Sequence, residues 1–191
     1  MGRADARMRE LILFHGMIDF KPRPDTLDVL VRAILSQQLS DSAASTIKKR
    51  VNELFPAGRI TPSSLYKIRH SRLRRVGVSP QKATYLKGLG KRIAQGHIDL
   101  SKLRDMDDNE VLKILDDVRG IGPWTAQMVL IFSLGRPDIM PSYDLGIQAS
   151  VMRLYRLRTR PTLEQIERVS KPWRPFRTIA CLYLWRDRDG Q

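Results

Sequence analysis

Hydrophobic residues recur at helical spacing along most of the chain. Between residues 26 and 37, leucine, valine and isoleucine side chains follow the i, i+3, i+4, i+7 pattern and therefore share one helical face. The same spacing predicts further helices from Ser40 or Asp41 to 54, over 63–68 and 71–75, from 80 through 93, from Asp107 or Asp108 through 118, over 124–134 and 144–157, after Thr162, and over 175–185.

Several of these helices carry recognisable start and stop signals. Ser79 precedes Pro80, an N-cap followed by a first-turn proline. Thr162 and Gln165 have the spacing of a capping box. Pro56–Gly58 is a stop signal for the helix predicted from Ser40 or Asp41 to 54. Strand signals, repeats of fixed period and long linkers are missing from the sequence. We therefore expect an all-α fold.

The charge of the chain points to a phosphate-binding surface. The 191 residues include 34 Lys and Arg against 20 Asp and Glu, which gives a formal net charge of +14 and a pI near 10.5. This balance is typical of proteins that bind nucleic acid. An ordinary basic surface rich in ion pairs is the alternative.

Composition argues against a membrane protein. No apolar run approaches the ~20 residues that a spanning helix needs, and the first residues do not look like a signal peptide. We expect an intracellular protein, cytoplasmic and nucleoid-associated in a prokaryote or nuclear in a eukaryote.

Cysteine and histidine usage excludes several chemistries. The single cysteine, Cys181, leaves no internal disulfide and no four-cysteine zinc or iron–sulfur site. It lies in an apolar stretch, so we expect a buried small hydrophobe. His15, His70 and His97 stand in no recognisable relation to it, and we expect all three at the surface without a catalytic role.

The first motif with chemical meaning is the glycine pair Gly120 and Gly122 between two predicted helices. Glycines allow a tight turn with positive φ, and their lack of side chains lets a DNA backbone come close. The N–H groups that open the next helix would then bind a phosphate, while Ile121 packs between the helices. A simple helix–turn–helix corner is the alternative.

The second motif is Met140–Gly146, which follows an apolar helix and a loop. Asp144 lies where an N-cap belongs. Capping would fix its carboxylate at the start of a helix and aim it out of the loop. Capping and catalysis are therefore compatible roles for this residue.

Together these residues resemble the helix-hairpin-helix (HhH-GPD) DNA glycosylase superfamily, which is marked by a hairpin, a Gly/Pro-containing loop and then an aspartate. The hairpin is 115–126 and the catalytic loop is 135–146. Segments 33–40, 77–83 and 171–177 resemble the alkylpurine branch, DNA-3-methyladenine glycosylase II. The match runs from about Leu27 to Trp185, and we expect residues 1–191 to form a single glycosylase unit.

The resemblance implies two small helical subdomains, with the hairpin and the active-site cleft between them, and no N-terminal β domain. It also implies that the damaged nucleotide is flipped out of the duplex and that Asp144 is catalytic. Gln38 or Leu39 would fill the vacated space, with a core position as the alternative for Leu39. The other implied DNA-binding residues are Gly120, Gly122, Thr125, Ser79 and Lys82.

One position separates subclasses of the superfamily. In bifunctional members a lysine after the hairpin attacks the sugar and forms a Schiff base. The matching position in this sequence is Trp124. We therefore expect a monofunctional enzyme that leaves an abasic site, and we interpret Lys82 and Lys113 as surface charge or phosphate contacts.

The number of catalytic carboxylates indicates the substrate class. Glycoside hydrolysis usually uses two carboxylates, and Asp144 is the only candidate that the sequence offers. A purine such as 3-methyladenine or 7-methylguanine is already cationic and leaves without protonation, so one carboxylate suffices. Trp124 and Trp173 are expected to bind the cationic base through their ring faces, with core packing as the alternative for each. Trp185 is expected in the core.

Two further pocket positions leave the lesion open. Tyr143 stands where relatives commonly have an acidic residue, and Met128 replaces an aromatic residue of some relatives. A same-fold enzyme for uracil, an oxidised base or a mismatch is therefore an alternative, as is a non-catalytic DNA-binding protein.

The resemblance also sets expectations for cofactors and partners. It implies a Na⁺ or K⁺ ion at the backbone carbonyls of Asp116, Val118 and Ile121. No cofactor is expected to be required, and neither an iron–sulfur cluster nor zinc. The expected partner is double-stranded DNA with damaged bases, bound by a monomer, with no membrane involved.

Overall fold

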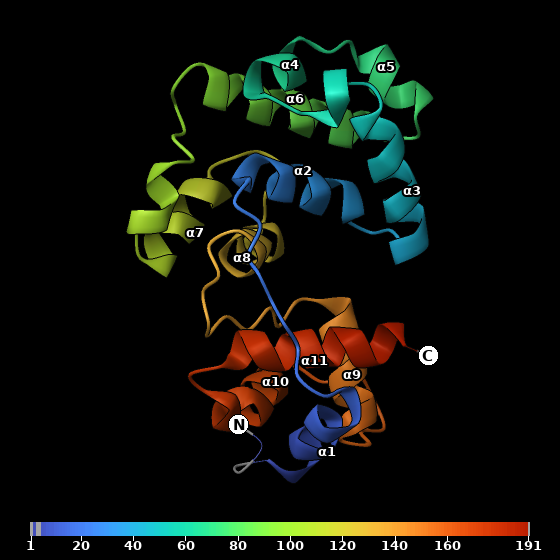
Figure 1. Cartoon of the computed structure of the whole chain (residues 1–191), viewed down its shortest axis with the longest axis vertical. Helices are drawn as coiled ribbons and strands as arrows, with labels where there is room; N and C mark the ends of the chain where they lie inside the picture. Colours follow the sequence, from blue (N-terminus) through green and yellow to red (C-terminus); the bar gives the residue numbers. More distant parts are fainter. Residues whose placement is uncertain (1, 3–4, 191) are drawn as a thin grey trace. The chain divides into compact units, whose positions relative to one another are not determined.

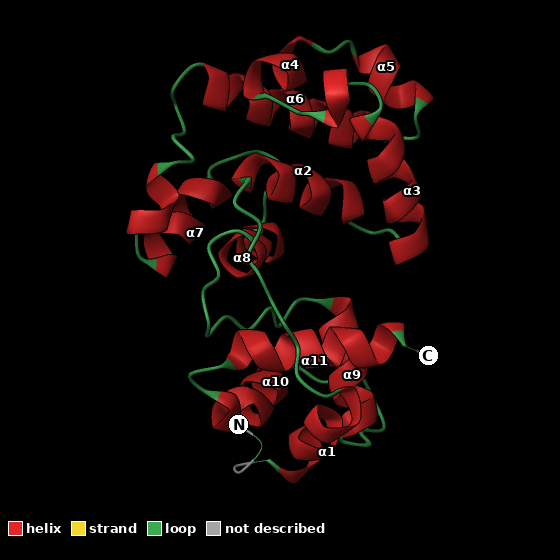
Figure 2. Cartoon of the chain, viewed as in Figure 1, coloured by secondary structure: helices red, strands yellow, loops and turns green. Residues whose placement is uncertain are grey.

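The computed structural model describes residues 2 and 5–190, apart from the side chains of Asp41 and Asp189. Every regular element in this part of the chain is a helix, and no strand occurs in it (Figure 2). The prediction of an all-α fold is confirmed. Among the same residues, no helix combines the length and the apolar character needed to cross a bilayer.

The chain folds into two compact units, which matches the prediction of two small helical subdomains. One unit is Arg23–Leu134, called here the hairpin unit. The other joins Met1–Pro22 to Gly135–Gln191 and is called the aspartate unit.

The hairpin unit is built around one central helix, α2. Its α-helices are α2 (Thr26–Ser36), α3 (Asp41–Asn52), α4 (Pro62–Lys67), α5 (His70–Arg75), α6 (Pro80–Ala94), α7 (Asp108–Asp116) and α8 (Pro123–Phe132), with 3₁₀ turns at Pro56–Gly58 and Lys102–Asp105. Helix α2 packs against α3, α6 and α8, and lies between α6 and α8 in Figure 1. Leu30, Ile34 and Leu35 on this helix are fully buried, and each such side chain stabilises the fold by about 1.5–3 kcal/mol.

Side-chain caps fix the helix starts of this unit. Ser40 Oγ accepts a hydrogen bond from the Ala43 N–H at 3.4 Å, and Ser79 Oγ accepts one from the Lys82 N–H at 3.2 Å. Asp107 opens α7 in a capping box with Glu110. Each cap contributes about 1 kcal/mol. The sequence had predicted all three starts.

The aspartate unit packs its helices around the C-terminal helix. Its elements are α1 (Ala6–His15), α9 (Leu145–Leu154), α10 (Leu163–Ser170), a 3₁₀ turn at Lys171–Trp173 and α11 (Arg177–Asp189). Helix α11 contacts both α1 and α9. Its Cys181 lies in the core with Ile147 and Val151, as predicted, and burial raises the pKa of the Cys181 thiol.

Two helices of this unit differ from the prediction. Helix α1 was not predicted, because only Met8 and Leu11 of its apolar residues are buried and no continuous apolar stripe exists. Helix α11 starts two residues after Pro175 and continues past Trp185. The extra turn places Asp187 3.3 Å from His15 Nε2. The prediction that His15 is a surface residue was therefore wrong, whereas His70 and His97 are exposed.

Candidate active site

The hairpin between α7 and α8 needs glycine at Gly120 for two reasons. Its φ is +92°, a left-handed conformation that other residues rarely adopt, and an added Cβ would overlap the ring of Tyr85. Gly122 has a φ of −105° and open space where a Cβ would stand. The prediction of positive φ therefore holds for Gly120 alone. Ile121 is buried, as expected, and its N–H donates to the Val118 carbonyl at 2.9 Å.

The N-terminus of α8 has the features of an anion site. Gly122 is its N-cap and offers no side-chain cap, and Pro123 occupies the first turn. The N–H groups of a helix start carry partial positive charge and bind phosphate well. Because Gly122 has no side chain, a DNA backbone can approach this helix start closely.

A groove of about 560 Å³ lies beside the hairpin within the same unit. It brings together most of the residues predicted to contact DNA. Its lining consists of Gln37, Gln38, Leu39, Ser79, Gln81, Lys82, Tyr85, Gly120, Ile121 and Gly122. Thr125 is the exception among the predicted residues, because its side chain is buried.

Gln37, which the sequence analysis did not single out, connects the groove to the hairpin. Its Nε2 donates to the Gly120 carbonyl and to Thr125 Oγ1, both at 3.0 Å. Thr125 therefore supports the hairpin from inside rather than offering its hydroxyl to DNA. A glutamine at the end of a predicted helix gives no sequence signal for such a role.

Lys82, which the sequence analysis interprets as surface charge or a phosphate contact, is partly buried and hydrogen-bonded within the hairpin unit. Its Nζ donates to the carbonyls of Leu35 and Gln37, at 2.8 and 2.6 Å. These carbonyls belong to the C-terminal end of α2, where a cation is favourable. Burial lowers the pKa of the Lys82 ammonium. The side chain thus holds the loop that carries Gln38 and Leu39 while still lining the groove.

The predicted gap-filling residues stand out from the surface. Gln38 is exposed and has a φ of +55°, a conformation uncommon for a residue with a side chain. Leu39 is 39% exposed, so the alternative that it belongs to the core is wrong. An exposed leucine on a loop fixed by Lys82 has the shape and polarity to enter a base stack.

The carboxylate of Asp144 is buried and held at a helix start. It caps α9, and its Oδ1 accepts the Ile147 N–H at 2.7 Å, as the capping prediction required. Trp185 Nε1 donates to the same oxygen at 3.1 Å. Two fixed donors on one oxygen leave the carboxylate little freedom to turn.

Trp185 and Arg188 are site residues that the sequence analysis missed. Trp185 was predicted to be core, yet its indole contacts Asp144 and its side chain is only partly buried. A Cβ built at Gly146 would collide with the Arg188 guanidinium and would lie 3.0 Å from Asp144 Oδ1. The guanidinium therefore lies over Gly146, beside the carboxylate. The sequence analysis ended this helix at Trp185, so it predicted neither the position of Arg188 on the helix nor the contact of Trp185 with Asp144.

The prediction of Trp173 in the base pocket was wrong. Its side chain is fully buried in the core of the aspartate unit. Its Nε1 donates to Asp5 Oδ2 at 2.8 Å, and the Tyr155 hydroxyl donates to the same carboxylate oxygen. A ring packed on all sides has no face to offer a base.

The remaining pocket candidates differ in exposure. Trp124 is partly buried on α8, and Tyr143 is 57% exposed just before Asp144. Met128 is buried in the hairpin unit, and its place in the base pocket stays a prediction. A base pocket that includes Trp124 and Tyr143 stays a prediction.

A family model matches most of the chain. The family described as "HhH-GPD superfamily base excision DNA repair protein" matches residues 31–175. The Bacillus subtilis protein YfjP is 36% identical over 163 residues, which make up 82% of this chain and 57% of YfjP. This chain thus spans little more than half of that relative.

In two comparisons with Schizosaccharomyces pombe, the relative is matched over a larger share of its own length. DNA-3-methyladenine glycosylase 1 is 34% identical over 166 residues, 86% of this chain and 73% of that protein. The solved structure of the 3-methyladenine DNA glycosylase from this yeast, in complex with abasic DNA, has a TM-score of 0.88 at 32% identity and covers 95% of this chain and 91% of the other. These matches confirm the predicted superfamily and its alkylpurine branch. The chain belongs to the HhH-GPD superfamily of base excision DNA repair proteins.

Proposed function

We propose that this chain is a DNA N-glycosylase that removes alkylated purines, such as 3-methyladenine and 7-methylguanine, from double-stranded DNA. The observation that carries the proposal is the buried Asp144 carboxylate, held at the start of α9 by the Ile147 N–H and the Trp185 indole. The hairpin, the groove beside it and the relatives named for 3-methyladenine support the same activity.

The chemistry follows from one fixed carboxylate. Breaking the N-glycosidic bond leaves positive charge on the sugar, and a preorganised carboxylate stabilises that charge by several kcal/mol. Asp144 can also accept a proton from the attacking water. Asp138 and Asp187 are paired with arginines, Asp138 with Arg177 and Asp187 with Arg153. Since these carboxylates are engaged, no general acid is assigned, and a cationic purine needs none.

The enzyme is monofunctional in this proposal. A Schiff base needs an amine beside the sugar, and the position of the lysine in bifunctional members is occupied by Trp124. The product is therefore free base and an intact strand with an abasic site. The indole of Trp124 also offers a π face to a cationic purine, a contact of about 0.5–2 kcal/mol.

We propose that a monovalent cation binds at the hairpin. Asp116 is the last residue of α7 and Val118 follows it, so their carbonyls carry the partial negative charge of a helix C-terminus. With the Ile121 carbonyl they would supply neutral oxygen donors, the kind of ligand that Na⁺ or K⁺ takes. A bound ion would add positive charge near a phosphate at α8. Among the described residues no group of three or more His, Cys, Asp or Glu side chains could hold a metal ion.

The setting follows from the reaction. The partner is double-stranded DNA that contains damaged bases, and the net charge of +14 favours its phosphates. We propose that the protein acts as a monomer, in the nucleoid of a prokaryote or the nucleus of a eukaryote.

A panel of defined duplexes tests the proposal. Each duplex carries one lesion: 3-methyladenine or 7-methylguanine, uracil, 8-oxoguanine or a mismatch, and released base is measured by chromatography. We expect release of the methylated purines and at least a hundredfold slower release with Asp144→Asn, because the amide keeps the cap but loses the charge. Binding of abasic duplex by the variant should match wild type. Release of only uracil or an oxidised base would contradict the substrate class, and binding without any release would indicate a non-catalytic hairpin protein.

A further inference from the structure

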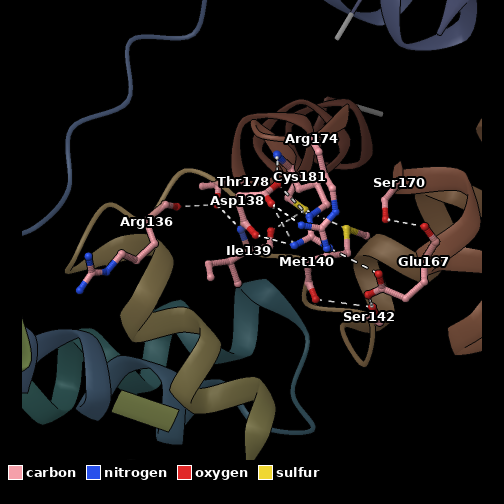
Figure 3. Close-up of polar contacts among 11 residues, drawn as sticks. Arg136, Asp138, Ile139, Met140, Ser142, Glu167, Ser170, Arg174, Thr178 and Cys181 are labelled. Atoms are coloured by element: carbon pink, nitrogen blue, oxygen red, sulfur yellow. Dashed lines mark hydrogen bonds and ion pairs between the residues drawn. The ribbon is translucent and has the colours of Figure 1, made fainter. Parts of the chain in front are cut away.

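The loop that leads into Asp144 has its own set of polar contacts. Residues 136–143 belong to the aspartate unit, lead along the chain from α8 toward α9 and contain no regular helix. The Asp144 N–H donates to the Pro141 carbonyl at 2.8 Å, so the position of the catalytic carboxylate depends on the path of this loop. Figure 3 shows that side chains from α10 and α11 converge on it.

Arg177, the first residue of α11, grips the loop at Asp138. Its Nε donates to Asp138 Oδ1 at 2.8 Å, and its Nη2 donates to the Asp138 carbonyl at 2.8 Å and to Oδ2 at 3.2 Å. The Arg177 side chain is only 11% exposed. Burial alone would raise the pKa of Asp138, but the hydrogen bonds and charges of Arg177 and Arg174 outweigh it and lower that pKa. Such a forked arginine–carboxylate contact is directional as well as strong.

The same guanidinium reaches the far end of the loop through Glu167. Arg177 Nη1 donates to Glu167 Oε2 at 3.4 Å, and Ser142 Oγ donates to Glu167 Oε1 at 3.2 Å. The Ser142 carbonyl in turn accepts the Gln148 amide at 2.9 Å. Ser142 is two residues before Asp144, so the contacts of one arginine bracket the segment from Asp138 to the catalytic residue.

The residue after Arg177 fixes the start of the loop. Thr178 Oγ1 donates to the Arg136 carbonyl at 2.6 Å and accepts the Ile139 N–H at 3.0 Å. The Thr178 N–H donates to the Pro137 carbonyl at 3.0 Å. Because Thr178 already anchors residues 136–139, the loop keeps its origin when Arg177 is changed. What Arg177 adds is the geometry of the part nearest to Asp144.

We propose that Arg177 is a positioning residue for base excision, which sets the Asp144 carboxylate through Asp138 on one side and through Glu167 and Ser142 on the other. This inference rests on the proposed function, since it concerns the carboxylate that acts on the glycosidic bond. A displacement of a catalytic group by about 1 Å can lower the rate about a hundredfold. Lysine would keep the charge of Arg177 but lose the fork, so Arg177→Lys isolates geometry from charge.

The kinetic test compares Arg177→Lys with Arg186→Lys, a matched control at an exposed position of the same helix. Single-turnover release of 3-methyladenine gives the rate constant, its amplitude gives the active fraction, and titration with abasic duplex gives the Kd. We expect Arg177→Lys to lower the rate constant at least tenfold, with active fraction and Kd within twofold of wild type, and Arg186→Lys to change nothing. A normal rate constant, or a loss confined to the active fraction, would overturn the proposal, because a structural role alone removes folded molecules.

A second readout does not depend on activity. The Trp185 indole N–H donates to Asp144 Oδ1 at 3.1 Å, so its ¹H–¹⁵N signal reports where the carboxylate lies. The chain has three tryptophans, and Trp→Phe variants assign their signals. We expect Arg177→Lys to move the Trp185 signal and Asp138→Asn to move it in the same direction, while the double variant moves it little further. The Trp124 signal should not move in these variants, and the Arg186→Lys control should leave the Trp185 signal unchanged. An unmoved Trp185 signal would refute positioning even if the rate falls. A wild-type protein that releases no alkylpurine would refute the proposed function instead, and the signal would still decide the role of Arg177.

Discussion

At the scale of single residues, Asp5 ties the first helix to the core. Its carboxylate caps α1 by accepting the N–H groups of Arg7 and Met8, and it also accepts Trp173 Nε1 and the Tyr155 hydroxyl. Burial by itself would raise the pKa of Asp5, but these hydrogen bonds outweigh it, so the pKa lies below its ordinary value of 3.8. A carboxyl group with a lowered folded-state pKa stabilises the fold above its unfolded pKa, and this stabilisation disappears as the pH falls through the folded pKa.

Asp5→Asn should therefore destabilise the protein in a pH-dependent way. We expect a lower Tm than wild type at pH 7, and a difference that shrinks as the pH falls from the ordinary pKa of 3.8 toward the lowered pKa of folded Asp5. Thermal melts between pH 7 and pH 3 measure it. Asp19→Asn is the control, because Asp19 is exposed and its ion pair is with the exposed Lys21. A Tm difference that is the same at both ends of this range would contradict the account.

The tryptophans show what single residues can and cannot reveal in a sequence. Trp173 and Trp185 both lie in the C-terminal part of the sequence, and each combines a large ring with one N–H donor. The two differ in the carboxylate that accepts the indole N–H. Trp173 donates to Asp5, which is 168 residues away in the sequence, and Trp185 donates to Asp144, which is 41 residues away. Asp144 itself was predictable, because a cap after a Gly/Pro loop is a local feature.

At the scale of elements, the hairpin separates two roles of its glycines. Gly120 is required by a positive φ and by contact with Tyr85, whereas Gly122 has open space around it. Gly122→Leu should therefore fold with a Tm close to wild type but bind every duplex at least tenfold more weakly, since phosphate contacts carry no sequence information. Gly120→Ala should lower the Tm. Thermal melts measure the Tm, and fluorescence anisotropy with duplexes of unrelated sequence measures the affinity for DNA. If Gly122→Leu binds DNA as tightly as wild type, the hairpin has only a structural role.

The helices themselves were largely predictable, because their signals are local. Ser79, Asp107 and Thr162 cap the helices assigned to them, and the apolar face of α2 follows the expected spacing. Helix α1 lacks such a face, as Leu13 and Phe14 are exposed, and is held by Asp5 through distant partners. The roles of Gln37 and Lys82 were missed for the same reason: their side chains satisfy carbonyls and hydroxyls that only the folded hairpin unit brings within reach.

At the scale of the whole molecule, the charge of the chain bears on the proposed action on DNA. Its net charge of +14 provides affinity for any duplex. Selection of a lesion then depends on how easily a base leaves the stack and on how readily its glycosidic bond breaks. In the proposed mechanism Asp144 assists every base and no general acid is assigned, so that only a base that is already a good leaving group departs quickly. The proposed preference for cationic purines follows from this limit.

The type of reaction can be tested by trapping with borohydride. Trp124 occupies the position of the lysine in bifunctional members, and an indole cannot attack a sugar. The best amine of the groove is Lys82, whose pKa is lowered by burial, but its Nζ is engaged by the carbonyls of Leu35 and Gln37. We therefore expect no covalent protein–DNA adduct when borohydride is added during turnover of a methylated-purine duplex. The product strand should stay intact until heat or alkali cleaves it. Lys82→Met assigns any adduct that does form: one that disappears in this variant would identify Lys82 as a lyase nucleophile, one that persists would place the amine elsewhere, and either would refute the monofunctional proposal.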